Sequence, residues 1–154
     1  MKDQLLETWQ INQQKNILLI DNISEAGMQK TLSTRGGRTI FQQWIHIHNV
    51  CMQRLEICAK DIFSQYKMLD KDLEVNKKLL VDSLNDSALA ISILPGNCYD
   101  NGGKVKGFKK GVIPLLGYLI SHESHHRGNM VLTLKQSGEK LSDAIKWGLW
   151  EWGK

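Results

Sequence analysis

The sequence contains few cysteines, and this scarcity excludes two classes of protein. The three cysteines, Cys51, Cys58 and Cys98, form an odd set without a Cys-x-x-Cys pair. This pattern indicates neither a disulfide framework nor a zinc ribbon. We expect reduced thiols, and because Cys51 and Cys58 share one face of a helix, we interpret both as buried structural side chains.

The sequence also lacks a long apolar stretch. The longest apolar run, residues 112–120, is about half of the ~20 residues that a membrane span requires, and it contains Pro114 and Gly117. Residues 1–14 are polar and amphipathic, whereas a secretion signal has an unbroken apolar stretch behind a basic start. We therefore expect a cytoplasmic protein that does not associate with a membrane.

The sequence also lacks a large excess of charge of either sign. The formal net charge is +4, and the only local cluster is a group of lysines in a glycine-rich stretch. These are Lys104, Lys106, Lys109 and Lys110. Because no RNA- or DNA-binding motif accompanies them, we expect a solvated loop and no nucleic-acid partner, although the loop could attract an anionic small molecule.

Apolar residues recur at helical spacing along most of the 154 residues, and no strand alternation or internal repeat accompanies them. The predicted long helices cover about 3–21, 39–66, 70–93 and 112–136, and a short helix follows over 142–152. Four helices of this length predict an all-α four-helix bundle. The chain is long enough to bury a core, so we predict one domain over residues 1–154.

The helix boundaries are marked by local signals. Thr39 followed by Gln42 predicts a capping box, and Pro95 with Gly96 predicts the end of the third helix. Residues 22–38 are expected to connect the first two helices with at most one helical turn, and residues 95–111 are expected to form a loop. The leucines expected in the core of the third helix are Leu73, Leu80, Leu84 and Leu89.

The five histidines are confined to two of the predicted helices. His46 and His48 lie on the second, and His122, His125 and His126 lie on the fourth. Positions four apart share a helix face, so His122 and His126 can converge on one metal ion, while His125 points about 100° away from His126. His46 and His48 are about 200° apart, so only one of them is expected to face the interior as a third ligand.

Residues 122–126 also match the H-E-x-x-H pattern of zinc proteases, in which the glutamate is the general base. No histidine follows to complete such a site, although Glu139 or Glu151 could supply a third ligand. Glu123 would point away from the line of His122 and His126. The protease interpretation is therefore the weaker one.

Three tryptophans, Trp147, Trp150 and Trp152, lie close together near the carboxyl end. We expect them to pack against the bundle. The alternatives are that they line a pocket or cover an interface.

Two histidine-bearing segments resemble the DinB family. Residues 120–138, ISHESHHRGNMVLTLKQSG, look like its last core helix, with the approximate pattern H-x-x-x-H-R-G-Q, apolar residues and a terminal glycine. Residues 39–50, TIFQQWIHIHNV, resemble the first ligand-bearing helix, and residues 148–152, GLWEW, resemble the usual carboxyl end. Asn129 stands where the family commonly has glutamine.

The resemblance implies a DinB-type bundle with unusual connectivity, often a homodimer, and a divalent metal ion in an open three-histidine site. The implied ligands are His46, His122 and His126, because histidine seven residues after the capped start at Thr39 fits the family's helix. His48 is the alternative to His46. Zinc is our first choice of ion, with nickel, iron or manganese as the others.

Characterised DinB relatives include transferases and isomerases that use low-molecular-weight thiols. Our leading hypothesis is a metal-dependent enzyme that activates a small-molecule thiol for transfer to an electrophile, a thiol S-transferase-like reaction. Arg127 or the Lys104 to Lys110 loop would attract the carboxylates of the thiol. The alternatives are a metal-dependent hydrolase that activates water, and a non-catalytic metal-binding stress-response module.

Overall fold

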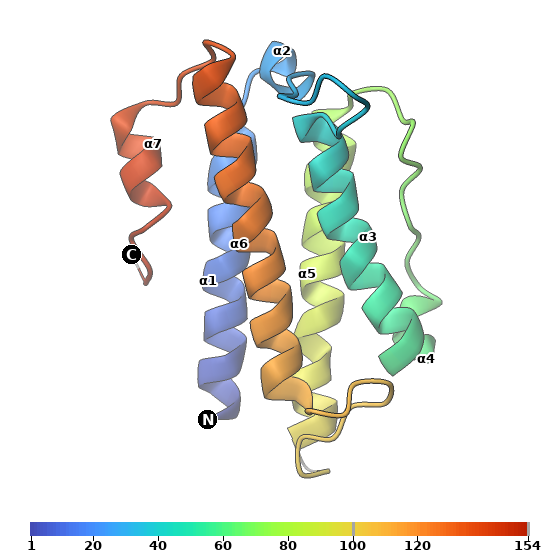
Figure 1. Ribbon diagram of the computed structural model, residues 1–154. Coiled ribbons are helices and arrows are strands. Elements are labelled where there is room, and N and C mark those ends of the chain that lie inside the picture. The colour runs from blue at the N-terminus through green and yellow to red at the C-terminus, as the bar shows by residue number, and fades with distance from the viewer. Residues whose placement is uncertain (100, 154) are drawn as a thin grey trace.

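The computed structural model describes residues 1–99 and 101–153, and every regular element in them is a helix. Four long helices lie side by side (Figure 1). They are α1 (Lys2–Asp21), α3 (Ile40–Cys58), α5 (Lys77–Tyr99) and α6 (Val112–Gln136). Three short helices are α2 (Glu25–Met28), α4 (Lys60–Phe63) and α7 (Asp143–Gly148). The predicted all-α bundle with a short carboxyl-terminal helix is confirmed.

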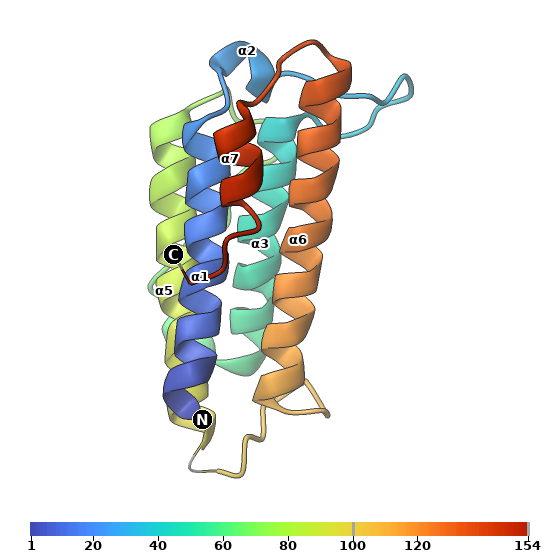
Figure 2. The same cartoon turned by 90° about the vertical axis from the view of Figure 1, so that its left-hand side faces the viewer.

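The long helices run in two directions. Figures 1 and 2 show α1 and α6 running one way and α3 and α5 running the other. Because α3 and α5 are parallel neighbours, residues 64–76 return along the outside of the bundle between them (Figure 1). Asn49 holds this return: its side chain donates a hydrogen bond to the Leu69 carbonyl and accepts one from the Leu69 N–H, both at 2.8 Å.

Two helices begin or end elsewhere than predicted. The second predicted helix ends at Cys58 because Ala59, with φ of −151°, turns the chain into α4. The third begins at Lys77 because the Asn76 side chain caps it, accepting a hydrogen bond from the Leu79 N–H at 2.9 Å. The capping box that begins α3 is confirmed.

The third predicted helix also continues past its expected end. It runs through Pro95 to Tyr99, and both Leu94 and Pro95 are buried. Packing in the core thus holds the last turn helical, although proline offers no N–H to it. Leu80 and Leu84 are fully buried as predicted, whereas Leu89 is 60% exposed and lies on the outer face of α5.

Two apolar clusters fill the bundle. One contains Trp9 and Leu119, and the other contains Leu19 and Met130. Along α1 and α6, buried polar residues lie between these positions: Asn12, Asn16, Glu123 and Arg127. The interior therefore consists of two apolar ends and a polar layer between them. In the part of the chain that the structure describes, no helix has the length and apolar character needed to cross a bilayer.

Candidate metal centre

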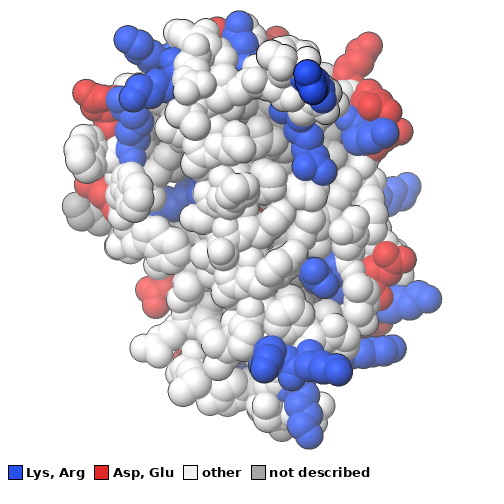
Figure 3. Space-filling view, viewed as in Figure 1, with Lys and Arg blue, Asp and Glu red and all other residues white. Residues whose placement is uncertain are grey.

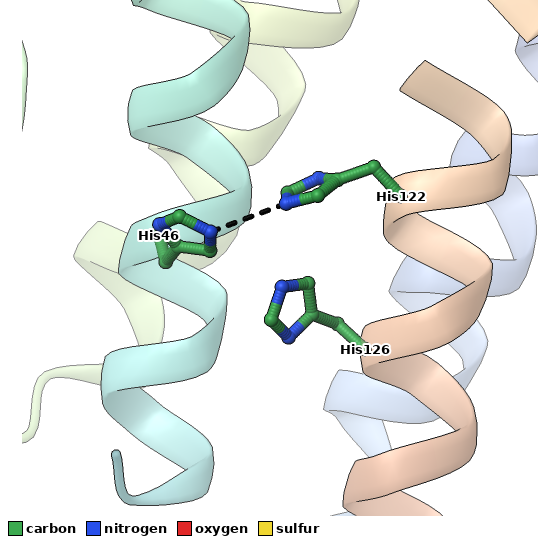
Figure 4. A group of neighbouring side chains, drawn as sticks. All are labelled: His46, His122 and His126. Carbon is green, nitrogen blue, oxygen red and sulfur yellow. Dashed lines mark hydrogen bonds between the residues drawn. The ribbon is translucent and has the colours of Figure 1, made fainter. Parts of the chain in front are cut away.

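Three histidine rings meet between α3 and α6 (Figure 4). His46 projects from α3, and His122 and His126 project from α6 toward it. The Nε2 atoms of His46 and His122 are 3.1 Å apart, and the ring centroids are separated by 4.7 to 5.0 Å. One ring nitrogen from each histidine lies within 4.8 Å of the other two. This spacing is compact enough for one metal ion to contact all three.

The donor set fits a divalent cation. Two neutral imidazoles tolerate facing nitrogens only if one of them carries the proton, whereas a shared cation attracts both lone pairs. Imidazole nitrogen suits zinc, nickel and iron, and three such ligands leave at least one position open.

Gln43 orients one of the rings. Its Oε1 accepts a hydrogen bond from Nδ1 of His126 at 3.2 Å, which leaves Nε2 of His126 free for a ligand. Gln43 is buried and lies one turn before His46 on α3, so the same helix supplies one ring and orients another. Sequence reasoning missed Gln43, although this spacing was the available signal.

The surroundings favour the neutral form of all three rings. Burial, with smaller contributions from nearby positive groups including Arg38, lowers the pKa of both His46 and His126 to about 4. The pKa of His122 is lowered for the same reasons, burial first. Neutral imidazole is the form that binds metal, so the rings are ready for an ion at neutral pH.

His48 lies on the other side of α3. Its ring is buried, with Nδ1 2.8 Å from the Ser83 carbonyl oxygen and Nε2 2.9 Å from the Lys67 carbonyl oxygen. Burial lowers the pKa of His48, and the two carbonyl groups oppose that shift. With both nitrogens on backbone oxygens, His48 joins α3 to α5 and to the returning segment, and it is not part of the histidine group.

A polar cleft of about 440 Å³ opens beside the histidines. Residues from the segment before α3, from α3 and from α6 line it. They are Thr31, Leu32, Ser33, Gly37, Arg38, Gln43, His125, His126, Asn129 and Thr133. The cleft gives a small molecule access to the side of His126.

Positive side chains flank the histidines on two sides. Arg38 lines the cleft. On the other side, the Arg54 guanidinium lies 4.9 Å above the centroid of the Tyr118 ring, which is stacked on His122 at 6.1 Å. Figure 3 shows Lys and Arg side chains above and below a mostly uncharged middle on this face. An anionic ligand is therefore favoured at this site over a cationic one.

Glu123 does not face the histidine cleft. Its carboxylate is buried and accepts hydrogen bonds from the side-chain amides of Asn12 and Asn16 on α1, at 2.5 and 2.7 Å. Burial raises the pKa of Glu123, against the opposing effect of these amides and of Arg127. The Cys51 thiol donates to the same carboxylate at 3.6 Å and is itself buried, as predicted. Glu123 therefore cannot act as the base of an H-E-x-x-H protease here.

The basic residues expected to attract a substrate lie elsewhere. Arg127 is buried and donates hydrogen bonds to the side chains of Asn16 and Ser124. Lys104, Lys109 and Lys110 line a different cavity, of about 500 Å³, where the loop enters α6. The positive groups that act electrostatically on the histidines are instead Arg38 and Arg54, and no local motif marks either of them.

A family model matches part of this chain. The model of the DinB family matches residues 106–144, a partial match to that domain that includes His122 and His126 but not His46. The predicted resemblance is confirmed for this part of the chain. Comparisons with curated proteins and with solved structures gave no significant match.

Proposed function

On the premise that residues 106–144 match the DinB family, we propose that this chain holds one divalent metal ion with His46, His122 and His126 and uses it to activate a small-molecule thiol. The convergence of three ring nitrogens within 4.8 Å is the observation that carries the proposal. Their position beside a polar cleft supports a catalytic site over a closed structural one.

A divalent ion in this position lowers the pKa of a thiol or water that binds to it and so supplies a nucleophile near neutral pH. The protein's own residues hold the ion and orient its ligands. Three neutral imidazoles bind the ion, and Gln43 keeps the His126 ring in one tautomer. His126 lines the cleft, through which an electrophile can approach.

Arg38 and Arg54 support an anionic thiol as the substrate. Arg38 lines the cleft, and Arg54 is held beside the histidines by its contact with Tyr118. A carboxylate on the thiol would pair with a guanidinium while the sulfur reaches the ion. Zinc as the ion, a homodimer and a cytoplasmic location stay predictions.

The metal site is tested by metal analysis of the purified protein. We expect one equivalent of divalent metal per chain in the wild type and its loss in His46→Ala, His122→Ala and His126→Ala. His125→Ala, an exposed neighbour on the same helix, is the matched control and should keep its metal. Unchanged metal content in the three variants would contradict the proposal.

The reaction is tested separately from the metal. Metal-loaded protein is assayed with mercaptoacetate and 1-chloro-2,4-dinitrobenzene, and we expect thioether formation that a chelator abolishes. Ester hydrolysis without thiol transfer would identify the hydrolase. Ligand binding without either reaction would identify the non-catalytic module.

A further inference from the structure

A further cavity, of about 370 Å³, lies under the carboxyl-terminal tail. Arg127, Gly128 and Val131 of α6 form one wall, and Lys146, Trp150 and Trp152 belong to the other. At about 100° per residue, Gly128 and Val131 project from α6 on the side roughly opposite His122 and His126. The cavity is therefore separate from the histidine cleft.

The wall formed by the tail is anchored to the bundle. Lys15 of α1 is buried and donates a hydrogen bond from Nζ to the Glu151 carbonyl oxygen at 2.6 Å. Gly148 lies so close to α1 that a Cβ there would be 3.0 Å from Cδ2 of Leu18. Leu149 packs against the apolar cluster that contains Leu19. These contacts anchor the segment that carries the tryptophans to α1 and to the apolar core.

The cavity combines aromatic surface with positive charge. Trp150 is 80% exposed and Trp152 is 46% exposed, so both rings have surface that a ligand could cover. The lining includes two cations, Arg127 and Lys146, and no carboxylate. Lys146 forms an exposed ion pair with Asp143, and such a pair is weak in water. A ligand with an aromatic ring and a negative charge would complement this lining.

Arg127 can bind a further acceptor. Guanidinium carries five N–H donors, and the described residues account for hydrogen bonds from Nη1 to Asn16 and from Nη2 to Ser124. Glu123 approaches the same guanidinium from the inner side, with 3.9 Å between Nη1 and Oε2. These inner contacts hold the group in place while it lines the cavity.

We propose that this cavity is a binding site for a small aromatic carboxylate. The indole rings of Trp150 and Trp152 would cover the aromatic ring, and Arg127 and Lys146 would pair with the carboxylate. A volume of about 370 Å³ is within the usual range of small-molecule pockets. The site does not use the histidine group.

Gly128 allows the cavity to be filled without disturbing the helix. A Cβ at Gly128 meets no atom within 4 Å, and the same is true at Gly117, which lies on α6 three turns earlier and outside the cavity lining. Leucine is a better helix former than glycine, so Gly128→Leu and Gly117→Leu should both fold. The first fills the cavity, and the second is its matched control.

The probe is 1-naphthoate, titrated calorimetrically. We expect one equivalent to bind wild type and Gly117→Leu with the same Kd, and to bind Gly128→Leu at least about tenfold more weakly. The uncharged analogue 1-naphthamide should bind wild type about tenfold more weakly, because it lacks the carboxylate. His122→Ala should bind 1-naphthoate as wild type does, whether or not it retains metal.

Several results would overturn this proposal. They are the absence of saturable naphthoate binding to wild type, equal binding by Gly128→Leu, equal binding of the uncharged analogue, and loss of binding in His122→Ala. A smaller molar mass of Gly128→Leu in sedimentation would show that a second copy of the chain occupies the cavity, and would overturn it as well. None of these results bears on metal content, so the proposed function is tested independently.

Discussion

The polar residues on two sides of α6 differ in whether they are paired within the chain or available to a ligand. Toward α3, His122 and His126 meet His46, and a polar cleft opens beside His126. Toward α1, Glu123 and Arg127 are buried, and the amides of α1 satisfy the carboxylate. Polar groups that find partners within the chain are part of the fold. Groups that converge on each other beside a cleft are instead available to a ligand.

Removal of the buried carboxylate should give the largest effect. In Glu123→Ala, Arg127 and the amides of Asn12 and Asn16 lose their partner, so we expect the free energy of unfolding to fall by about 3–5 kcal/mol. Urea denaturation measures this loss. The control His125→Ala, exposed on the same helix, should change it by less than about 0.5 kcal/mol. Equal effects of the two substitutions would show that the polar layer does not stabilise the bundle.

Glu123→Gln sharpens the same measurement. The amide oxygen of glutamine can still accept from Asn12 and Asn16, so this variant should be more stable than Glu123→Ala. It should also keep its metal, because Glu123 faces away from the histidines. Loss of metal in Glu123→Gln would be inconsistent with the separation of the two sides of α6.

A smaller effect is expected from Arg38. In the metal-loaded protein, Arg38→Ala should raise the KM for mercaptoacetate about tenfold, equivalent to about 1.4 kcal/mol. The KM for cysteamine, a cationic thiol, should not rise. Arg35→Ala is the control, because Arg35 is exposed in the same segment and does not line the cleft. An equal change for both thiols would show that Arg38 does not recognise charge.

The pH dependence of stability should give the smallest effect. The pKa of His126 falls from 6.5 to about 4 on folding. The contribution of His126 to the stability of the folded protein is therefore complete above pH 6.5 and is lost as the pH falls toward 4. Glu123 has a raised pKa, so its contribution has the opposite sign and is lost as the pH rises through the folded value.

Urea midpoints of the metal-free protein between pH 4 and 8 separate these contributions. As the pH falls from 6.5 toward 4, the free energy of unfolding should fall less in His126→Ala than in wild type. One proton changes that free energy by at most about 1.4 kcal/mol per pH unit, and the difference should be smaller than this because the His126 ring is partly open to solvent. Glu123→Gln should remove the loss of stability that Glu123 causes as the pH rises. A His126→Ala profile parallel to wild type would contradict the pKa shift.

The fold was predictable where a local signal coincides with packing. The capping box at Thr39 and the apolar periodicity of α6 predicted the helices that carry the histidines. The same periodicity predicted too long a second helix, because apolar spacing continues past Ala59 although the backbone turns there. Ile62 remains buried after the turn, so burial alone did not reveal the break.

The histidine group was predictable only in part. Spacing paired His122 with His126, and the angle between His46 and His48 showed that one of them would face α6 but not which one. The DinB resemblance favoured His46. The structure brings His46 to the pair, because the Ser83 and Lys67 carbonyl groups draw His48 to the opposite side of α3.

The sequence by itself determined the helices and the pairing of His122 with His126, since hydrogen bonding and side-chain spacing within a helix depend on residues a few positions apart. Only the tertiary structure decided the surroundings of that pair. Arg38, Gln43 and Arg54 reach the histidines, and Asn12 and Asn16 reach Glu123, because helices distant in sequence pack together. Contacts across such distances depend on how the whole bundle assembles, which no local pattern encodes.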